Sequence, residues 1–442
     1  MNLSLKHINK IAIPALISGV SEPILSLTDA AIVGNIKINA VEALAAVGIV
    51  TTFISMLIWV LGQTRSAISS IVSQYVGANK LEQVKNLPAQ AILIITSLSI
   101  LLILITYPFA KNIFKLYNAT NLILDYTVVY YKIRVLGFPF TLFTIAVFGV
   151  FRGLQNTYFP MIIAIIGTTT NIVLDIILVY GITGYIEPMQ IQGAAYASVI
   201  AQVLMAVLAA YYIIKKTKIS LKPKLPFNPE MQRFGLMVFN LFIRTIALNI
   251  TLYYASSFAT RYGAQYIAAY TIAINLWFLG AFIIDGYASA GNILSGKLFG
   301  AKDYSKLLNL SNKLIKYGIF VGVFMATIGV LFYYPLGLLF TKEPLVLETF
   351  YKVFWIVLIM QPLCSLAFIF DGIFKGLGKM EYLRNVLLCS TFFVFIPVLF
   401  WLDSLNFKLH GIFIALTFWI IARGVPLIIK FRQLFSSLTQ KT

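Results

Sequence analysis

Three polar side chains stand in stretches of the sequence that are otherwise apolar enough to lie in a membrane. Asp29 lies in LSLTDAAIVG, and Asn171 and Asp175 begin and end the stretch NIVLD. Residues at positions i and i+4 share one face of a helix, where the carboxamide of Asn171 can donate to a carboxylate. The pattern predicts a polar site inside the membrane.

Asp29 and Asp175 are expected at a similar depth, roughly 9 to 10 Å below the outer ends of their helices. Two carboxylates close together in a medium of low dielectric constant repel each other when both are ionised. At least one is therefore expected to hold a proton. These residues predict a proton-binding switch, or alternatively structural groups that are satisfied by Arg65, Arg134 or neighbouring hydroxyl groups.

A second set of charges is predicted in the later part of the chain. Inserting a charged side chain at the centre of a spanning helix costs on the order of 2.5 to 3.5 kcal/mol by insertion scales. A charge at such a position therefore indicates a functional or structural role. Arg244, Asp285 and Asp371 are interpreted as a charge-balanced cluster, with either a coupling or a structural role. Glu22, just before Pro23, is a further proton site or the partner of a basic residue.

The elements that carry these residues are predicted to be membrane-spanning helices. The chain has 442 residues, is 60% hydrophobic and 11% charged, and has a mean hydropathy of +0.89, which is typical of an all-α polytopic membrane protein. A spanning helix needs roughly 20 apolar residues. The first apolar run lacks a cleavage pattern and is expected to stay as a helix. Twelve spans are predicted: 8–36, 43–75, 88–110, 122–150, 159–181, 191–214, 234–261, 266–299, 314–340, 345–374, 382–403 and 409–429.

Basic residues set the expected orientation. The net charge is +19, and Lys and Arg concentrate in the loops on one side when both termini are placed in the cytoplasm. We therefore expect an integral protein of the bacterial inner membrane with cytoplasmic termini. No segment is long enough for a basic folded domain, so nucleic acid is not an expected partner. Cys364 and Cys389 predict neither a disulfide framework nor a metal site.

The chain divides into two similar halves. Residues 215–233 contain three prolines and a basic excess, and they are interpreted as a cytoplasmic linker between lobes 1–214 and 234–442. GVFRGL at 149–154 matches GIFKGL at 372–377, VGAN at 76–79 matches FGAK at 299–302, and LAAV at 44–47 matches IAAY at 267–270, all at one offset. The matches predict two pseudo-symmetric bundles of six helices. Because six is even, the repeat is parallel.

The two-bundle plan favours a carrier that works by alternating access. An enzyme is not indicated, because the two histidines, His7 and His410, lie at opposite ends of the chain. The sequence has no G-x-x-x-x-G-K-[ST] loop for ATP, and no cofactor is predicted. A channel fits the composition, but the duplication and the buried carboxylates favour a carrier.

Several segments resemble one family of transporters. PALISGVSEPILSLTDAAIVGNI, FRGLQNTYFPMI, NIVLDIILVYGITG, IQGAAYASVIAQ and FDGIFKGLGKMEYLRN are similar to segments of the multidrug and toxic compound extrusion (MATE) transporters, especially the DinF-like branch. The resemblance runs through nearly the whole chain. It implies a secondary antiporter that exports small organic, often cationic and amphipathic compounds in exchange for H⁺ or Na⁺, and that acts in the lipid bilayer, with a monomer as the expected functional unit.

The resemblance also implies roles for particular residues. In DinF-like members the aspartate of the first helix is the proposed proton acceptor, and the Asn and Asp of the fifth support it; these positions are Asp29, Asn171 and Asp175 here. Another branch uses acidic residues of the second lobe for cation coupling. The seventh span here reads LFIRTIALN, with Arg244 and no acid, which favours protons, while Asp371 leaves Na⁺ coupling open. A flippase for lipids or oligosaccharides is a further alternative.

Overall fold

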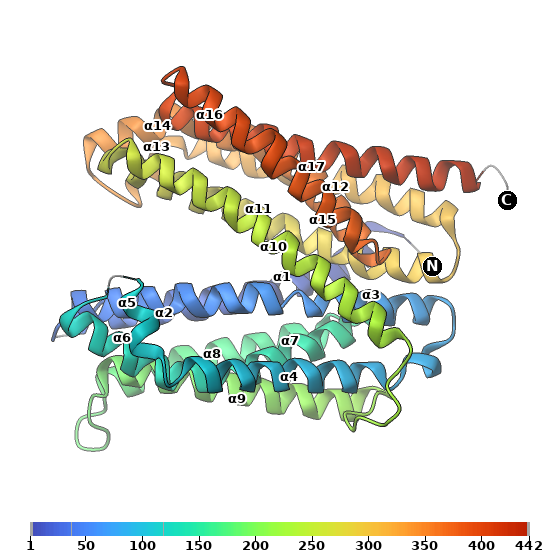
Figure 1. The fold of residues 1–442 in the computed structure, drawn as a ribbon, viewed down its shortest axis with the longest axis horizontal. Helices are drawn as coiled ribbons and strands as arrows, with labels where there is room; N and C mark the ends of the chain where they lie inside the picture. Colours follow the sequence, from blue (N-terminus) through green and yellow to red (C-terminus); the bar gives the residue numbers. More distant parts are fainter. Residues whose placement is uncertain (1–2, 37, 118, 440–442) are drawn as a thin grey trace. The chain divides into compact units, whose positions relative to one another are not determined.

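The computed structural model describes residues 3–36, 38–117 and 119–439, without the side chains of Glu22 and residues 436–439. Within this part of the chain the secondary structure is helical, apart from one isolated bridge between Ile182 and Ile186 (Figure 1). Among the described residues, twelve segments are long and apolar enough to cross a membrane. The predicted number of spans and the all-α fold class are therefore confirmed.

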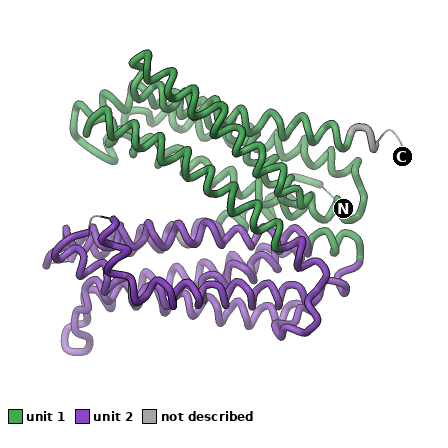
Figure 2. Tube along the Cα trace, in the orientation of Figure 1, with its two compact units in different colours: residues 1–16, 73–79, 235–442 green, residues 17–72, 80–234 purple. Residues whose placement is uncertain are grey.

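The chain forms two compact units (Figure 2). Unit 1 comprises Met1–Leu16, Ser73–Asn79 and Gly235–Thr442, and unit 2 comprises Ile17–Val72 and Lys80–Phe234. The division between the units thus falls within the first, third and tenth α-helices. The sequence-based lobes 1–214 and 234–442 stay a prediction.

Unit 2 is built from the first nine α-helices. The first helix, α1 (Leu5–Val33), is helical through Pro14 and Pro23, and its part from Ile17 onward belongs to this unit. The other eight α-helices and two short 3-10 helices, η1 and η2, are α2 (Ala40–Leu61), α3 (Thr64–Gly77), η1 (Leu81–Val84), α4 (Leu87–Thr106), α5 (Ala110–Lys115), α6 (Asn121–Arg134), η2 (Val135–Gly137), α7 (Phe138–Gly153), α8 (Tyr158–Tyr180) and α9 (Gln190–Lys216).

Unit 1 contains the longer helices of the second half. Its helix α14 packs against α11, α12 and α17, so it is the central helix of the unit. A short π-helix, η3, interrupts the eleventh span. The bounds are α10 (Glu230–Arg261), α11 (Ala264–Gly300), α12 (Tyr304–Leu331), α13 (Tyr333–Leu338), α14 (Pro344–Gly376), α15 (Met380–Cys389), η3 (Ser390–Phe395), α16 (Ile396–Ser404) and α17 (Lys408–Thr439).

The repeated GxFxGL segments pack in the same way in both units. In unit 2, a Cβ atom added to Gly149 would lie 2.7 Å from the carbonyl oxygen of Arg65 on α3. In unit 1, a Cβ atom added to Gly372 would clash with the carbonyl oxygen of Ala288 on α11. Arg65 and Ala288 are themselves separated by the repeat offset. The glycines let two helices approach closely, as small residues do in membrane bundles, so the sequence repeat is also a repeat of packing.

The linker is held against unit 2 by hydrogen bonds. The amide of Gln90, near the start of α4, donates to the carbonyl oxygens of Lys224 at 2.6 Å and Pro226 at 3.2 Å. Its side-chain oxygen accepts from the backbone N–H of Asn228 at 2.9 Å. These bonds satisfy backbone groups of a segment that lacks regular structure of its own.

Candidate functional site

The predicted residues Asp29, Asn171 and Asp175 lie together in unit 2. All three are fully buried. They come from α1 and α8, and residues of α6 and α9 complete the group. We refer to it as the Asp29 cluster, which comprises Asp29, Tyr130, Arg134, Asn171, Asp175 and Ser198.

Asp29 is the acceptor at the centre of this cluster. The hydroxyl of Tyr130 donates to its Oδ2 at 2.7 Å, and the hydroxyl of Ser198 lies 2.8 Å from Oδ2 and 3.1 Å from Oδ1. The amide of Asn171 lies 3.5 Å from Oδ1. Arg134 supplies the positive charge, with its Nε 3.8 Å from Oδ2. Neutral donors therefore hold the carboxylate at short range, and the cation is the most distant of its partners.

The local sequence explains how these side chains converge. Tyr130 and Arg134 are four residues apart on α6, as Asn171 and Asp175 are on α8, so each pair projects from one helix face. On α9, Ser198 lies in the small-residue stretch GAAYAS, and α9 packs against α8. A Cβ atom on Gly193 would lie 2.6 Å from the backbone of Leu178 on α8, so this glycine permits the close approach.

Asp175 differs from Asp29 in its surroundings. Neither of its carboxyl oxygens accepts a hydrogen bond from the described residues, and Oδ1 of Asn171 has no partner there either. The charge of Asp29 is close enough to act on Asp175. Burying an ionised carboxylate without donors is costly. The site therefore offers three oxygen atoms that suit a proton or a hard cation.

The second predicted set is only partly brought together. In unit 1, Arg244 Nη2 lies 2.5 Å from Oδ1 of Asp371, and Lys375 Nζ lies 2.9 Å from Oδ2. The predicted member Asp285 lies elsewhere on α11 with an exposed side chain. The side chain of Glu22 lies outside the described residues. We refer to Arg244, Asp371, Lys375 and the nearby Arg423 as the Asp371 cluster.

Several members of the two clusters were not predicted from the sequence. Tyr130 and Ser198 are uncharged, and tyrosine and serine are common in apolar spans of this chain. Lys375 could have been found, because its i, i+4 spacing from Asp371 is a sequence-level signal for an ion pair. Arg423 is a charge within the predicted span 409–429, and a charge inside a span is itself such a signal.

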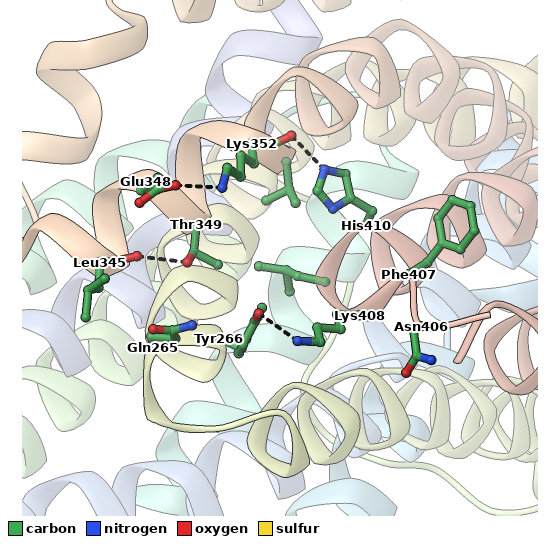
Figure 3. Close-up of a pocket in the computed structure, with 12 residues that line it drawn as sticks. Gln265, Tyr266, Leu345, Glu348, Thr349, Lys352, Asn406, Phe407, Lys408 and His410 are labelled. Carbon is green, nitrogen blue, oxygen red and sulfur yellow. Dashed lines mark hydrogen bonds and ion pairs between the residues drawn. The ribbon is translucent and has the colours of Figure 1, made fainter. Parts of the chain in front are cut away.

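A separate pocket of about 250 Å³ lies in unit 1, where α11, α14 and α17 begin (Figure 3). Its charged groups already have partners. Lys352 Nζ lies 2.6 Å from Glu348, Lys408 Nζ donates to the hydroxyl of Tyr266 at 3.2 Å, and His410 Nε2 lies 3.0 Å from the carbonyl oxygen of Lys352. None of the predicted site residues lines it, and this pocket is not the candidate site.

Known proteins resemble this chain over most of its length. Protein DETOXIFICATION 43 of Arabidopsis thaliana is 28% identical over 299 residues, which cover 67% of this chain and 55% of the plant protein. The chain thus spans little more than half the length of that relative. DNA damage-inducible protein F of Escherichia coli (strain K12) is 25% identical over 433 residues, which cover 96% of this chain and 91% of that protein.

The fold and the family profile agree with these relatives. A solved structure described as "Crystal structure of MATE in the bent conformation" has a TM-score of 0.91 and 20% identity, and the match covers 99% of this chain and 96% of that one. The sequence profile of the MatE family matches residues 14–177 and 241–401. Since the profile covers most of both halves, the chain belongs to the MatE family, whose members are membrane transporters and not enzymes.

Proposed function

We propose that this chain is a secondary antiporter that exports organic compounds in exchange for H⁺, with Asp29 as the group that binds the transported proton. Family membership supports export. The single observation that carries the choice of Asp29 is its environment: a fully buried carboxylate that accepts hydrogen bonds from the hydroxyls of Tyr130 and Ser198. Hydroxyl donors can reorient when a carboxylate is protonated, whereas the charge of a close cation would oppose protonation.

Protonation of Asp29 would change every contact in the cluster. The ionised carboxylate is only an acceptor, but the protonated group must also donate. Tyr130, Ser198 and Asn171 would then lose part of their hold on α1. Pro23 lies about 1.7 turns before Asp29 and lacks a backbone donor, so α1 is easier to bend there. In this proposal, the bend opens the path by which cargo leaves.

Asp175 is proposed to share the proton with Asp29. It has no hydrogen-bond donor among the described residues and is close enough to interact with Asp29. A neutral Asp175 avoids the cost of a second buried charge. Cargo would bind when Asp29 is ionised, so proton and cargo exclude each other through one cluster and each lowers the affinity for the other.

Na⁺ is the second candidate for the coupling ion. The observation that favours it is the set of donor-free oxygens on Asp175 and Asn171. Hard cations take carboxylate and amide oxygens as ligands. The same cluster would then hold Na⁺ in place of the proton, and an imposed gradient of each ion distinguishes the two.

The remaining features of the proposal follow from the sequence. The buried carboxylates of unit 2 favour cationic, amphipathic cargo. The concentration of Lys and Arg in alternate loops favours cytoplasmic termini, and a bacterial inner membrane is the proposed location. The proposed functional unit is a monomer, since each polypeptide has both of the predicted six-helix bundles.

The deciding experiment measures efflux of a fluorescent organic cation from liposomes under an imposed pH gradient or an imposed Na⁺ gradient. We expect efflux driven by the pH gradient in the wild type and its loss in Asp29→Asn, which keeps the side-chain shape but cannot ionise. Asp125→Asn is the matched control, because Asp125 is an exposed carboxylate on α6. Efflux by Asp29→Asn at the wild-type rate would contradict the proposal. Efflux driven only by the Na⁺ gradient would show that the coupling ion is Na⁺ and not H⁺.

A further inference from the structure

Unit 1 buries more positive than negative charge in the Asp371 cluster. Arg244, Lys375 and Arg423 all act electrostatically on the one carboxylate of Asp371. Both oxygens of that carboxylate are already occupied, Oδ1 by Arg244 and Oδ2 by Lys375. Arg423 is therefore a surplus cation in the membrane-spanning part of α17.

The guanidinium of Arg423 lies among apolar and aromatic groups. Its side chain is 4% exposed. The central carbon of the guanidinium lies 4.5 Å from the ring centroid of Trp419 and 5.4 Å from that of Phe368. Ring faces attract the positive charge but provide no acceptor for the five N–H groups. No hydrogen bond or ion pair of this guanidinium is recorded within residues 3–36, 38–117 and 119–435, so its N–H groups remain available.

The aromatic support of Arg423 is fixed in place. Trp419 is fully buried, and its Nε1–H donates to the hydroxyl of Thr391 at 3.1 Å. Thr391 lies in the π-helix η3 and its hydroxyl is 3.0 Å from that of Thr251 on α10. π-Helical turns occur frequently at functional sites. A guanidinium held against rigid rings loses little freedom when it binds a ligand.

We propose that Arg423 is the anchor of an oxyanion-binding site in unit 1, with Arg244 and Lys375 adding positive charge. The ligand is a carboxylate or a phosphate monoester, since both match the planar fork of a guanidinium with two parallel hydrogen bonds. Trp419 and Phe368 favour a ligand whose body is aromatic or otherwise apolar. Buried charges within spans face the interior or a water-filled cavity and mark ligand pathways.

This site does not depend on the proposed proton antiport, because it lies in unit 1 and uses none of the Asp29 cluster. It extends the range of ligands of the chain to compounds with an anionic group. Unit 2 would handle the coupling ion, whereas unit 1 would recognise the anionic group. The predicted cationic cargo would then be one class of ligand among at least two.

Binding of benzoate to the full chain in phosphatidylcholine nanodiscs tests the proposal. Benzamide and benzylammonium have a similar size and ring but are neutral and cationic. We expect saturable binding of benzoate at low ionic strength and weaker binding of the other two. Arg423→Gln should weaken benzoate binding about 10-fold or more, as expected for a lost charged hydrogen-bond pair.

Two further variants separate binding from folding. Arg261→Gln is the matched control, because Arg261 is an exposed arginine of unit 1 that pairs with Asp403, and it should bind benzoate like the wild type. Arg423→Lys keeps the charge but loses the planar fork, and we expect intermediate affinity. Equal affinity in the wild type and in folded Arg423→Gln and Arg423→Lys would overturn the proposal, as would equal binding of benzamide and benzoate.

The same experiment with a second lipid composition distinguishes a lipid headgroup from a soluble organic anion as the ligand. Nanodiscs that contain phosphatidic acid present a phosphate monoester at the membrane surface. Loss of benzoate binding in these discs, but not in discs with an equal charge of phosphatidylglycerol, would assign the site to a lipid headgroup. Unchanged binding would assign it to a soluble organic anion. Both results support the oxyanion site, and neither involves transport, so a failed antiport assay would not affect them.

Discussion

The Asp29 cluster and the Asp371 cluster are both buried inside membrane-spanning helices, yet their charges are arranged oppositely. In unit 2, the cluster has two carboxyl groups and one arginine, which lies 3.8 Å from Asp29, and hydroxyls make the shortest contacts to that carboxylate. In unit 1, one carboxylate is bound by two cations at 2.5 and 2.9 Å, and a third cation is left over. The first arrangement allows a carboxylate to gain a proton, whereas the second fixes the carboxylate in its ionised form.

This difference shows that the internal repeat preserved helix packing but not chemistry. Gly149 and Gly372 make equivalent close contacts in the two units. The positions equivalent to Asp29 and Asp175 at the repeat offset are Leu252 and Val398, so unit 1 has no counterpart of the carboxyl pair. The two units can therefore perform different tasks within one transport cycle.

The largest expected effect on stability comes from Asp371→Asn. Removing one partner of a buried ion pair leaves uncompensated charge and typically costs about 3 to 5 kcal/mol. We expect the free energy of unfolding to fall by this amount in detergent, and benzoate to restore part of it. Asp285→Asn, an exposed aspartate of the same unit, is the control and should change stability by about 0.5 kcal/mol or less. Equal stability of both variants would show that the ion pairs in unit 1 are not structural.

Tyr130→Phe is expected to have the next largest effect, on transport. It removes the 2.7 Å hydrogen bond to Asp29, and hydrogen bonds to charged groups contribute about 1.5 to 3 kcal/mol. Coupled efflux should fall about 10-fold. Tyr131→Phe is a close control, since Tyr131 is also fully buried but its hydroxyl donates to Thr106 at 2.6 Å. If both variants transported equally well, the hydroxyl of Tyr130 would have no special role.

Asp175→Asn should be tolerated in folding. Because Asp175 has no donor among the described residues and is proposed to be neutral, the amide replaces a neutral group of the same shape. We expect the melting temperature to stay the same or rise, in contrast to Asp371→Asn. Thermal unfolding of the two variants, measured side by side, tests this contrast. A loss of stability as large as that of Asp371→Asn would show that Asp175 is ionised and paired.

A modest loss of stability is expected at a carboxylate outside both clusters and outside the spans. Asp303 caps α12, because its carboxylate accepts from the backbone N–H of Lys306 at 3.1 Å. The side chain of Lys306 also donates to this carboxylate at 2.7 Å, and this ion pair together with the cap holds the pKa of Asp303 below its usual value. A lowered pKa means that the cap contributes stability at neutral pH, and the contribution is lost as the pH falls below about 4. Asp303→Ala should cost about 1 kcal/mol at pH 7.

The pH dependence of the unfolding free energy tests the prediction for Asp303. The difference in unfolding free energy between the wild type and Asp303→Ala should shrink as the pH is lowered from 7 to 3. Efflux at pH 7 should be unchanged. A difference that grows in acid would contradict the sign of the pKa shift.

The fold was predictable because its signals are local. Twelve apolar runs, each longer than a membrane is thick, indicate twelve spans wherever they occur. The repeat was visible in the sequence because each unit needs a glycine where two of its helices cross closely, so the GxFxGL segment occurs in both halves. Asn171 and Asp175 could be placed on one helix face from their spacing alone. A charge in an apolar run, such as Asp29, stands out because placing a charged side chain inside a membrane costs free energy.

The partners across helices could not be predicted in the same way. Tyr130 and Ser198 lie 101 and 169 positions from Asp29, and nothing in their own segments distinguishes them from other tyrosines and serines. Asp285 was grouped with Asp371 by charge, but the face of α11 that carries it is exposed. The direction of a helix face depends on all the helices that surround it.

The sequence by itself therefore determined the membrane setting, the number of spans, the duplication and the family, since these depend on composition and periodicity. Only the tertiary structure decided that hydroxyls hold Asp29, that two cations bind Asp371 and that Arg423 has no ion-pair partner among the described residues. The physical reason is that hydrophobic periodicity acts within one helix, whereas a buried polar group is satisfied by whichever distant helix packing brings beside it.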